Sequence, residues 1–201
     1  MLSLVMDTSN QYLMVALFEN GELLDSIVEL GSKRQSENAI PYLENLLKKH
    51  NKGLLDVEEV VITRGPGSYT GVRVAMAIAK TLSVISPIRL KTISSLAIYV
   101  NEGKCVSVLD ARSKKVFVCA YDNGKAVCEE QLVAISDFES FMESYVGYSV
   151  VGQAELVGYP QVETDLARNM YRLSVNEEYV EHIDALVPCY IKDVEAKKIC
   201  L

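Results

Sequence analysis

The stretch most suggestive of chemistry is residues 64–73, where three glycines and a proline lie between a β-branched run and an apolar run. It contains Arg64, Gly65, Pro66, Gly67, Ser68, Tyr69, Thr70, Gly71, Val72 and Arg73. Glycine-rich loops between a strand and a helix often bind phosphate, because the backbone can approach the anion closely. A Walker A loop places lysine directly after its last glycine, whereas Gly71 is followed by Val72. The sequence therefore predicts a sharp structural turn with Ser68 or Thr70 as the helix cap.

Histidine and cysteine, the usual residues of metal and nucleophile sites, occur here without a functional spacing. His50 and His182 are isolated, so no helix can present two imidazoles on one face. The five cysteines are an odd number and include no C-x-x-C pair. The sequence also lacks the G-x-S-x-G elbow of serine hydrolases. We therefore expect reduced thiols and no metal site.

Charge and hydropathy limit the partners of the chain. Asp and Glu exceed Lys and Arg, 27 to 20, and the net charge of −7 opposes an extended nucleic-acid surface. If an RNA is the final substrate, another chain must hold it. The apolar start at Met1–Met6 lacks a basic flank, and the longest apolar run, 74–88, contains Lys80. We expect a cytoplasmic protein without a membrane anchor.

The first half of the chain has the pattern of a three-stranded meander followed by alternating helices and strands. Asn20-Gly21 predicts a tight hairpin between the second and third strands, because a type I′ turn needs positive φ at both central residues. Apolar periodicity predicts strands at 2–6, 12–18, 22–30, 57–63 and 87–93, and helices from about 38 to 50, at 71–85 and in a short piece ending at 100.

The second half repeats the beginning of the first. Asp7 and Asp110, and likewise Asn20-Gly21 and Asn123-Gly124, are separated by the same 103 residues. Predicted strands at 105–109, 116–121 and 125–132 are followed by a helix at 137–145 and a strand at 148–151. We infer two copies of a β-β-β-α-β unit, with lobes at 1–102 and 103–201. The expected fold is α/β, a duplicated RNase H-like (actin-like ATPase, ASKHA) fold.

In such folds a nucleotide lies between the lobes, with its phosphates at the turn after the first strand of each half. These turns contain Asp7, Thr8 and Ser9 in the first half, and Asp110 and Arg112 in the second. Neither turn has the glycine that close approach to a phosphate usually requires. We therefore interpret both as degenerate phosphate hairpins and expect no cofactor.

Several segments carry a family resemblance. They are G-P-G-S-Y-T-G-V-R at 65–73, M-D-T-S at 6–9, V-L-D-A-R at 108–112 and V-P-C-Y-I-K at 187–192, near Glu195-Ala196. Together they make the chain similar to the TsaB (YeaZ) family, the inactive paralogues of the catalytic TsaD subunit within the Gcp/Kae-like, M22 glycoprotease-like proteins. One departure is Gln35 before Ser36-Glu37, where many relatives have histidine.

The resemblance implies a non-catalytic scaffold for the attachment of threonylcarbamoyl to an adenosine beside the tRNA anticodon. Its implied partners are a TsaD-type catalytic subunit and a TsaE-type ATPase, with tRNA bound only through the complex. The helix at 71–85 is apolar around most of its circumference, which indicates either deep burial or a face held for a partner. Small residues on the helix would let another helix approach closely, and the resemblance favours the partner. The predicted interface comprises Val72, Ala75, Met76, Ala79 and Ser83.

Two other functions fit the same residues. The chain could be an enzyme of this fold, either an ATP-dependent small-molecule kinase or a peptidase. It could also be a structural homodimer, because an apolar helix face can pair with its own copy in a symmetric interface.

Overall fold

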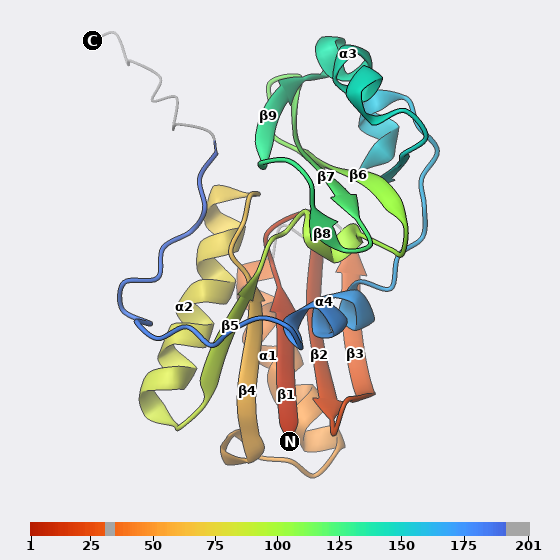
Figure 1. Cartoon of the computed structure of the whole chain (residues 1–201). Coiled ribbons are helices and arrows are strands. Elements are labelled where there is room, and N and C mark those ends of the chain that lie inside the picture. Colours follow the sequence, from red (N-terminus) through yellow and green to blue (C-terminus); the bar gives the residue numbers. More distant parts are fainter. Residues whose placement is uncertain (31–34, 192–201) are drawn as a thin grey trace, which may run out of the picture.

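The computed structural model describes residues 1–30 and 35–191. Two lobes, each built on its own sheet, lie one above the other in Figure 1. Lys192, Glu195, Ala196 and Cys200 lie outside the described residues. Within the described part, no helix is long and apolar enough to span a membrane.

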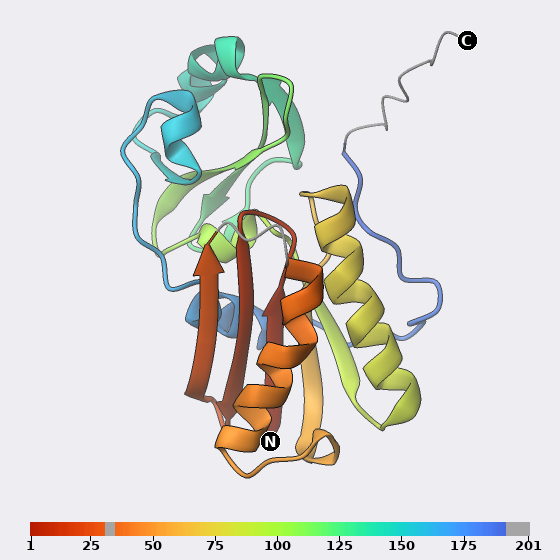
Figure 2. The ribbon, with the colours of Figure 1, turned by 180° about the vertical axis from the view of Figure 1, so that it is seen from behind.

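The first lobe holds a five-stranded sheet in the order β3-β2-β1-β4-β5. β1 is antiparallel to β2 and parallel to β4, and β4 is parallel to β5. The elements are β1 (Leu2–Asp7), β2 (Tyr12–Glu19), β3 (Glu22–Leu30), α1 (Gln35–Lys49), η1 (Leu54–Asp56), β4 (Val57–Thr63), α2 (Tyr69–Ile85), β5 (Arg89–Ile93) and η2 (Ala97–Tyr99). Helices α1 and α2 cover one face of this sheet (Figure 2) and enclose a core with Leu4, Val15 and Ile62.

The second lobe repeats the start of this pattern. Its sheet has the order β10-β6-β7-β8, with β9 also pairing with β7. β6 is antiparallel to β7 and parallel to β10, as β1 is to β2 and β4. The elements are β6 (Lys104–Asp110), β7 (Lys115–Asp122), β8 (Lys125–Ala126), β9 (Gln131–Ala134), η3 (Ile135–Asp137), α3 (Phe138–Met142), η4 (Glu143–Tyr145), β10 (Ser149–Gly152) and η5 (Ala154–Val157). The topology confirms the duplicated RNase H-like, actin-like fold.

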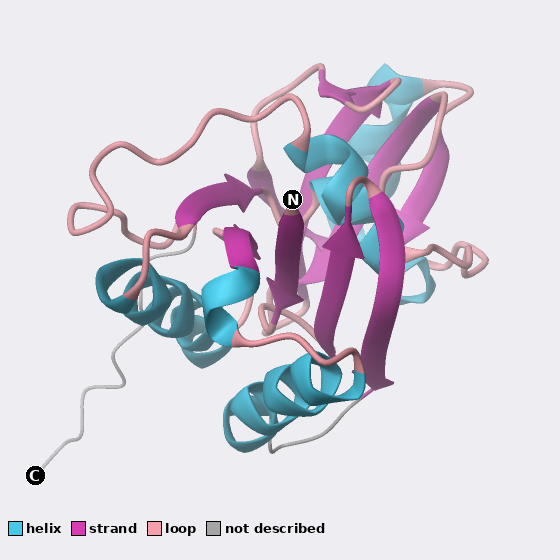
Figure 3. Ribbon diagram, turned by 90° about the horizontal axis from the view of Figure 1, so that it is seen from below, coloured by secondary structure: helices cyan, strands magenta, loops and turns pink. Residues whose placement is uncertain are grey.

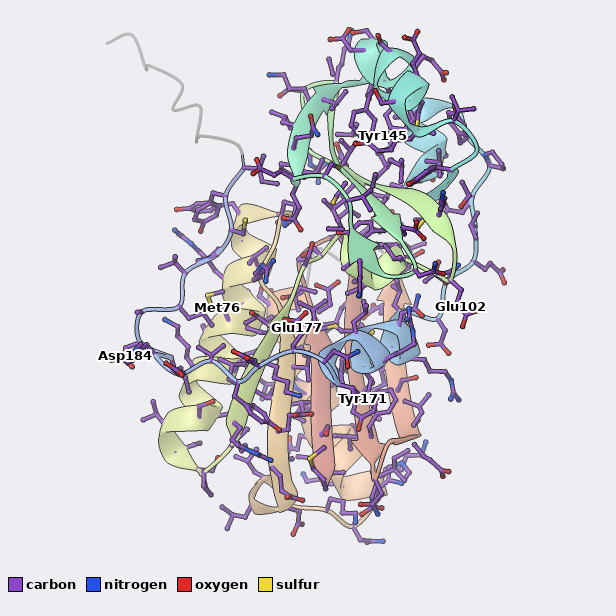
Figure 4. All side chains as sticks on the ribbon, viewed as in Figure 1. Met76, Glu102, Tyr145, Tyr171, Glu177 and Asp184 are labelled. Atoms are coloured by element: carbon purple, nitrogen blue, oxygen red, sulfur yellow. The ribbon has the colours of Figure 1, made fainter. Side chains whose placement is uncertain are left out.

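The chain then returns to the first lobe. A connector leads to α4 (Leu166–Ser174), which lies on the face of the first sheet opposite α1 and α2 (Figure 3). The Phe18 and Tyr171 rings stack there with their centroids 4.1 Å apart. Residues 175–191, here called the C-terminal strap, follow the edge strand β5 and the side of α2 (Figure 4 marks Glu177 and Asp184 on it).

Most expected elements are present, with four differences. The strand expected at 125–132 is split into β8 and β9, and the helix expected at 137–145 has only five α-helical residues between two 3-10 turns. Helix α1 begins at Gln35, before the expected start at about residue 38, and Pro41 lies inside it. α4 was not expected, although Asp165 caps it by accepting a hydrogen bond from the Arg168 N–H.

The division into lobes at 1–102 and 103–201 stays a prediction. The two sheets follow it, because β5 and η2 end the first set of elements and β6 begins the second. Helix α4 nevertheless packs on the first sheet although it belongs to the second range.

Candidate functional site

Residues 64–73, here called the glycine loop, join the end of β4 to the start of α2. Ser68 caps the helix, since its Oγ accepts a hydrogen bond from the Gly71 N–H at 3.3 Å. Of the two expected caps, Ser68 is therefore confirmed. Gly65 has φ +101°, a conformation that side chains rarely adopt, and the Gly65-Pro66 peptide is cis.

The glycine loop lies directly against the turn after β1. The Ser68 N–H donates to the Ser9 carbonyl at 2.7 Å, and Thr8 Oγ1 donates to the Gly71 carbonyl at 2.6 Å. A Cβ atom at Gly71 would lie 1.9 Å from the Thr8 carbonyl oxygen, and one at Gly67 would lie 2.3 Å from that of Ser9. These glycines therefore allow close contact with another part of the same chain.

Asp7 organises this turn from a fully buried position. Its Oδ1 accepts hydrogen bonds from the Thr63 hydroxyl at 2.6 Å and the Ser9 N–H at 2.8 Å, while Oδ2 accepts from Asn10 Nδ2 at 2.8 Å. Burial raises the pKa of the Asp7 carboxyl, and the hydrogen bonds from Ser9, Thr63 and Asn10 oppose that shift. Both carboxylate oxygens are thus used within the protein, and Asp7, Thr8 and Ser9 are closed off from solvent.

The second turn is more open and is held by its own aspartate. Asp110 Oδ1 accepts from the Arg112 N–H at 2.7 Å, and the Arg112 guanidinium lies 3.4 Å from Asp110 Oδ2. Arg112, Ser113 and Lys114 all have positive φ although none is glycine. Five residues were named for the degenerate hairpins: Asp7, Thr8, Ser9, Asp110 and Arg112. Of these five, only Arg112 has a largely exposed side chain.

One glutamine joins the two turns across the lobes. Gln153 Oε1 accepts from the Asp110 N–H at 2.6 Å, and Gln153 Nε2 donates to Gln11 Oε1 at 3.0 Å. The sequence analysis missed this link, because neither glutamine lies in a recognisable motif and only the fold brings residues 142 positions apart together.

The C-terminal strap closes the outer side of the glycine loop. The Cys189 N–H donates to the Arg64 carbonyl at 2.8 Å, and a Cβ atom at Gly65 would lie 2.8 Å from the Cys189 carbonyl oxygen. Arg73 Nε donates to the Tyr190 hydroxyl at 2.7 Å, and the Arg73 guanidinium lies 3.8 Å from the centre of the Tyr69 ring. The glycine loop and residues 187–190, which lie far apart in the sequence, are therefore parts of one structure.

Four of the five residues expected at the partner interface of α2 are buried within the first lobe. Val72, Ala75, Met76 and Ala79 are at most 4% exposed, and the last three belong to the core under the first sheet, whereas Ser83 is partly exposed. The helix has a wide apolar surface because it is covered by the sheet on one side and contacts α1 and the strap on others. Its outward face instead carries Ala77, Thr81, Val84 and Ile85, with Val84 82% and Ile85 61% exposed.

Metal ligands do not gather in the described residues: no group of three or more His, Cys, Asp or Glu side chains is placed to hold an ion. His50 Nε2 instead lies 2.9 Å from Asp25, which Lys49 also contacts at 2.7 Å. These groups form an ion-paired surface cluster.

Comparison with known proteins gives consistent matches. A family model described as "TsaD: tRNA N6-adenosine threonylcarbamoyltransferase" matches residues 27–143. The tRNA threonylcarbamoyladenosine biosynthesis protein TsaB of Bacillus subtilis is 26% identical, with 96% of this chain and 95% of the relative covered. TsaB of Haemophilus influenzae is 32% identical over 57% of this chain and 51% of its own.

A solved structure supports the fold. The crystal structure of a Pseudomonas aeruginosa protein, described as similar to peptidase YEAZ, superposes with a TM-score of 0.79 at 22% identity. The superposition covers 95% of this chain and 99% of that one.

Proposed function

We propose, because this chain belongs to the TsaD family described above and to its TsaB/YeaZ branch, that it takes part in the biosynthesis of threonylcarbamoyladenosine in tRNA. Its part is that of a non-catalytic subunit. The observation that carries this proposal is the contact between the glycine loop and the first turn. The place where a related enzyme would approach phosphate is filled by the chain's own backbone, with Gly71 against Thr8 and Gly67 against Ser9.

The proposed subunit binds a TsaD-type catalytic partner through the outward side of α1 and α2. Ile40 on α1 and Val84 and Ile85 on α2 are large apolar side chains that are about half or more exposed. Ala77, Thr81 and Ile85 are spaced four residues apart, so they share one side of α2, and Ala77 and Thr81 are small enough to admit a second helix. A complex formed here would then recruit a TsaE-type ATPase, and tRNA would be held by the other subunits, since the chain has a net charge of −7.

The alternative is an enzyme of the same fold, a small-molecule kinase or a peptidase. A kinase would need phosphate access at the first turn, where Asp7 and Thr8 are buried. A cysteine peptidase would need a thiolate near neutral pH. Burial raises the pKa of Cys105 to about 11 and that of Cys119 to about 12, and it also raises the pKa of Cys189. These three thiols are therefore protonated at neutral pH.

The functional test is depletion of the protein from its own cell, followed by nucleoside analysis of total tRNA. We expect threonylcarbamoyladenosine to fall and to return when the wild-type chain is supplied. Unchanged nucleoside levels would overturn the proposed role.

Partner binding and catalysis are tested with purified proteins. Gel filtration with the TsaD-type subunit should give a heteromeric complex, whereas the chain alone should be monomeric or self-associated through the same face. ATP hydrolysis and peptide cleavage by the chain alone should stay at background. Saturable micromolar ATP binding to the isolated chain would favour the kinase instead.

A further inference from the structure

Two cysteines of the second lobe lie opposite each other just beyond the β7–β8 hairpin. β7 and β8 are paired antiparallel, and the Val127 N–H extends their ladder by donating to the Ala120 carbonyl at 2.9 Å. The next step of the same register places Cys119 opposite Cys128. Residues directly opposite in an antiparallel ladder have Cα atoms about 4.5–5.5 Å apart, and a disulfide needs about 4.4–6.8 Å. The backbone therefore has the spacing of a disulfide at this point.

The chain leaves the ladder directly after Cys128. The β7–β8 register would bring residue 129 opposite Val118, whereas in β9 it is Gln131 that pairs with Val118. Glu129 and Glu130 are therefore extra residues, and 127–130 form a bulge without strand structure. Cys128 thus lies in a segment that can shift more easily than a paired strand can.

The two sulfur atoms occupy the same small space. The Cys119 thiol donates to the Cys128 carbonyl at 3.3 Å, and the Ala120 N–H donates to Cys128 Sγ at 3.2 Å. A hydrogen bond with the Cys128 thiol also raises the pKa of Tyr145, labelled in the second lobe in Figure 4, to about 12. Both cysteines are free thiols in this structure. Each sulfur therefore contacts the backbone on the opposite side of the ladder.

The two thiols differ in their access to solvent. Cys119 is fully buried in the core shared by the lobes, whereas Cys128 is only partly buried and lies between exposed Val127 and Glu129. Burial raises the pKa of Cys119 to about 12, and the neighbouring Cys128 thiol adds to the shift. A dissolved reagent can therefore reach Cys128 first, and Cys119 can react only with its neighbour.

We propose that Cys119 and Cys128 are a modification site at which a small disulfide converts the two thiols into an intrachain disulfide. The Cys128 thiolate attacks one sulfur of the reagent, forms a mixed disulfide and releases the first small thiol. Cys119 then attacks the Cys128 sulfur and displaces the second small thiol. The two electrons lost by the cysteines reduce the reagent, and the two cysteine protons end on the released thiols.

The bridge forms in a segment that also contacts the first lobe. Glu130, two residues after Cys128, accepts a hydrogen bond from Ser94 Oγ, which follows β5. The disulfide thus ties to the second sheet the segment that carries this contact between the lobes. The modification is independent of the proposed role in tRNA modification, since it uses none of the residues on which that role rests.

The test treats the reduced full chain with excess glutathione disulfide, followed by acid quenching, alkylation and mass spectrometry of tryptic peptides. Trypsin cuts after Lys115, Lys125 and Arg168, so Cys119 and Cys128 fall on separate peptides, 116–125 and 126–168, each with one cysteine. We expect these two peptides to become linked by a disulfide and to separate again after reduction with dithiothreitol.

Three variants test the order of the steps, and circular dichroism checks that each is folded. Cys119→Ala should form no linked peptide and should accumulate glutathione on Cys128. Cys128→Ala should also form none, and its buried Cys119 should take up glutathione about 10-fold or more slowly than Cys128 does in Cys119→Ala. Cys105→Ala, which removes a buried thiol on β6, is the matched control and should form the linked peptides as the wild type does.

Three outcomes overturn the proposal. The first is a wild-type chain in which Cys128 keeps glutathione, or stays reduced, while no linked peptides form. The second is a disulfide from Cys128 to a cysteine other than Cys119. The third is a folded Cys128→Ala protein whose Cys119 takes up glutathione as fast as Cys128 does in Cys119→Ala.

Discussion

At the scale of single residues, Gly67 and Gly71 allow the glycine loop to pack closely against the turn after β1. Each faces a carbonyl oxygen of the first turn at a distance that no Cβ could tolerate. The motif is therefore a packing motif. Its polar neighbours Thr8 and Asp7 hold the same contact by hydrogen bonds to Gly71 and Thr63.

The first prediction concerns these glycines. Gly71→Ala should lower the free energy of unfolding by about 3 kcal/mol or more, because overpacking against backbone can be relieved only by moving the turn or the helix. Gly53→Ala is the matched control, since Gly53 has negative φ and its nearest neighbour, Asp56 Oδ2, lies 3.6 Å from a Cβ. Urea denaturation measures both, and equal stability of the two variants would contradict the packing role.

The second prediction concerns Asp25, whose pKa is lowered to about 2 by hydrogen bonds from Lys49 and His50. A carboxyl whose pKa is lowered in the folded state stabilises the fold fully when the pH is above its pKa in the unfolded chain, near 3.8. This stabilisation is lost as the pH falls through the folded-state pKa of about 2. Asp25→Asn should therefore cost about 0.5–1 kcal/mol at pH 7, since Lys49 is largely solvent-exposed, and only a small part of that at pH 2, where the folded-state carboxyl is about half protonated.

Urea titrations of both proteins at pH 7, 4 and 2 measure this difference. A stability gap that stays constant down to pH 2 would mean that the ion pairs of Asp25 do not carry it.

At the scale of elements, α2 is the clearest case of one helix with two different faces. Its inner face packs on the first sheet, and its outer face keeps Ala77, Thr81 and Val84 in solvent. Two alanines only two positions apart, Ala79 and Ala77, therefore lie on the buried and on the exposed face of the helix.

The third prediction compares these alanines. Ala79→Glu should unfold the first lobe, because a charge at a fully buried position without a partner costs several kcal/mol, about 3–5 in comparable cases. Ala77→Glu should leave the circular dichroism spectrum and melting temperature nearly unchanged but abolish co-elution with the TsaD-type subunit. A folded Ala79→Glu protein would mean that α2 is not held as the structure has it.

The fourth prediction concerns the C-terminal strap and α4, which seal a buried ion pair between neighbouring strands. Lys91 Nζ lies 3.3 Å from Glu59 Oε2 and donates to the Ser174 carbonyl at 2.8 Å, while the Tyr179 hydroxyl donates to Glu59 at 2.8 Å. Lys91→Met should cost about 3–5 kcal/mol, since it leaves the Glu59 carboxylate buried and unpaired.

The double variant Glu59→Gln with Lys91→Met should recover most of this loss, because it removes the uncompensated charge as well. Thermal and urea denaturation of the two single variants and the double variant measure the coupling. Additive losses would show that the two side chains do not act as a pair.

At the scale of the whole molecule, the lobes share one core. The buried cluster on the α4 side of the first sheet contains Val5 and Phe18 from the first lobe, Leu109 and Phe117 from the second, and Met170 from α4. The connection between the lobes is therefore a packed interface, and the Gln11–Gln153 link adds a polar contact beside the turns.

The fifth prediction follows from this shared core. A fragment of residues 1–102 should not fold cooperatively, because without α4 the first sheet exposes the face that Tyr171 and Met170 cover. The full chain should show one unfolding transition by both circular dichroism and tyrosine fluorescence. Adding a peptide of residues 160–191 should restore structure to the fragment, and a cooperative melt of the fragment alone would contradict the prediction.

The sequence by itself determined the elements that depend on local patterns. Alternation and Asn-Gly turns placed β1–β3 and β6–β7, and the equal spacing of Asp7–Asp110 and Asn20–Asn123 indicated the duplication that the sheets confirm. The position before an apolar run limited the helix cap to Ser68 or Thr70, and the structure has Ser68 there. These features involve neighbours in the chain, whose geometry is fixed by period and backbone conformation.

Tertiary structure alone decided which face of α2 is buried and what the glycine loop touches. An apolar helix surface has the same pattern whether a sheet, a second helix or a partner covers it, so Ala79 and Ala77 could not be told apart from sequence. The contacts of Gly71 with Thr8, Cys189 with Arg64 and Gln153 with Gln11 join residues 63 or more positions apart. No local propensity encodes such pairs, because they form only when the sheets bring the strand ends and the strap together.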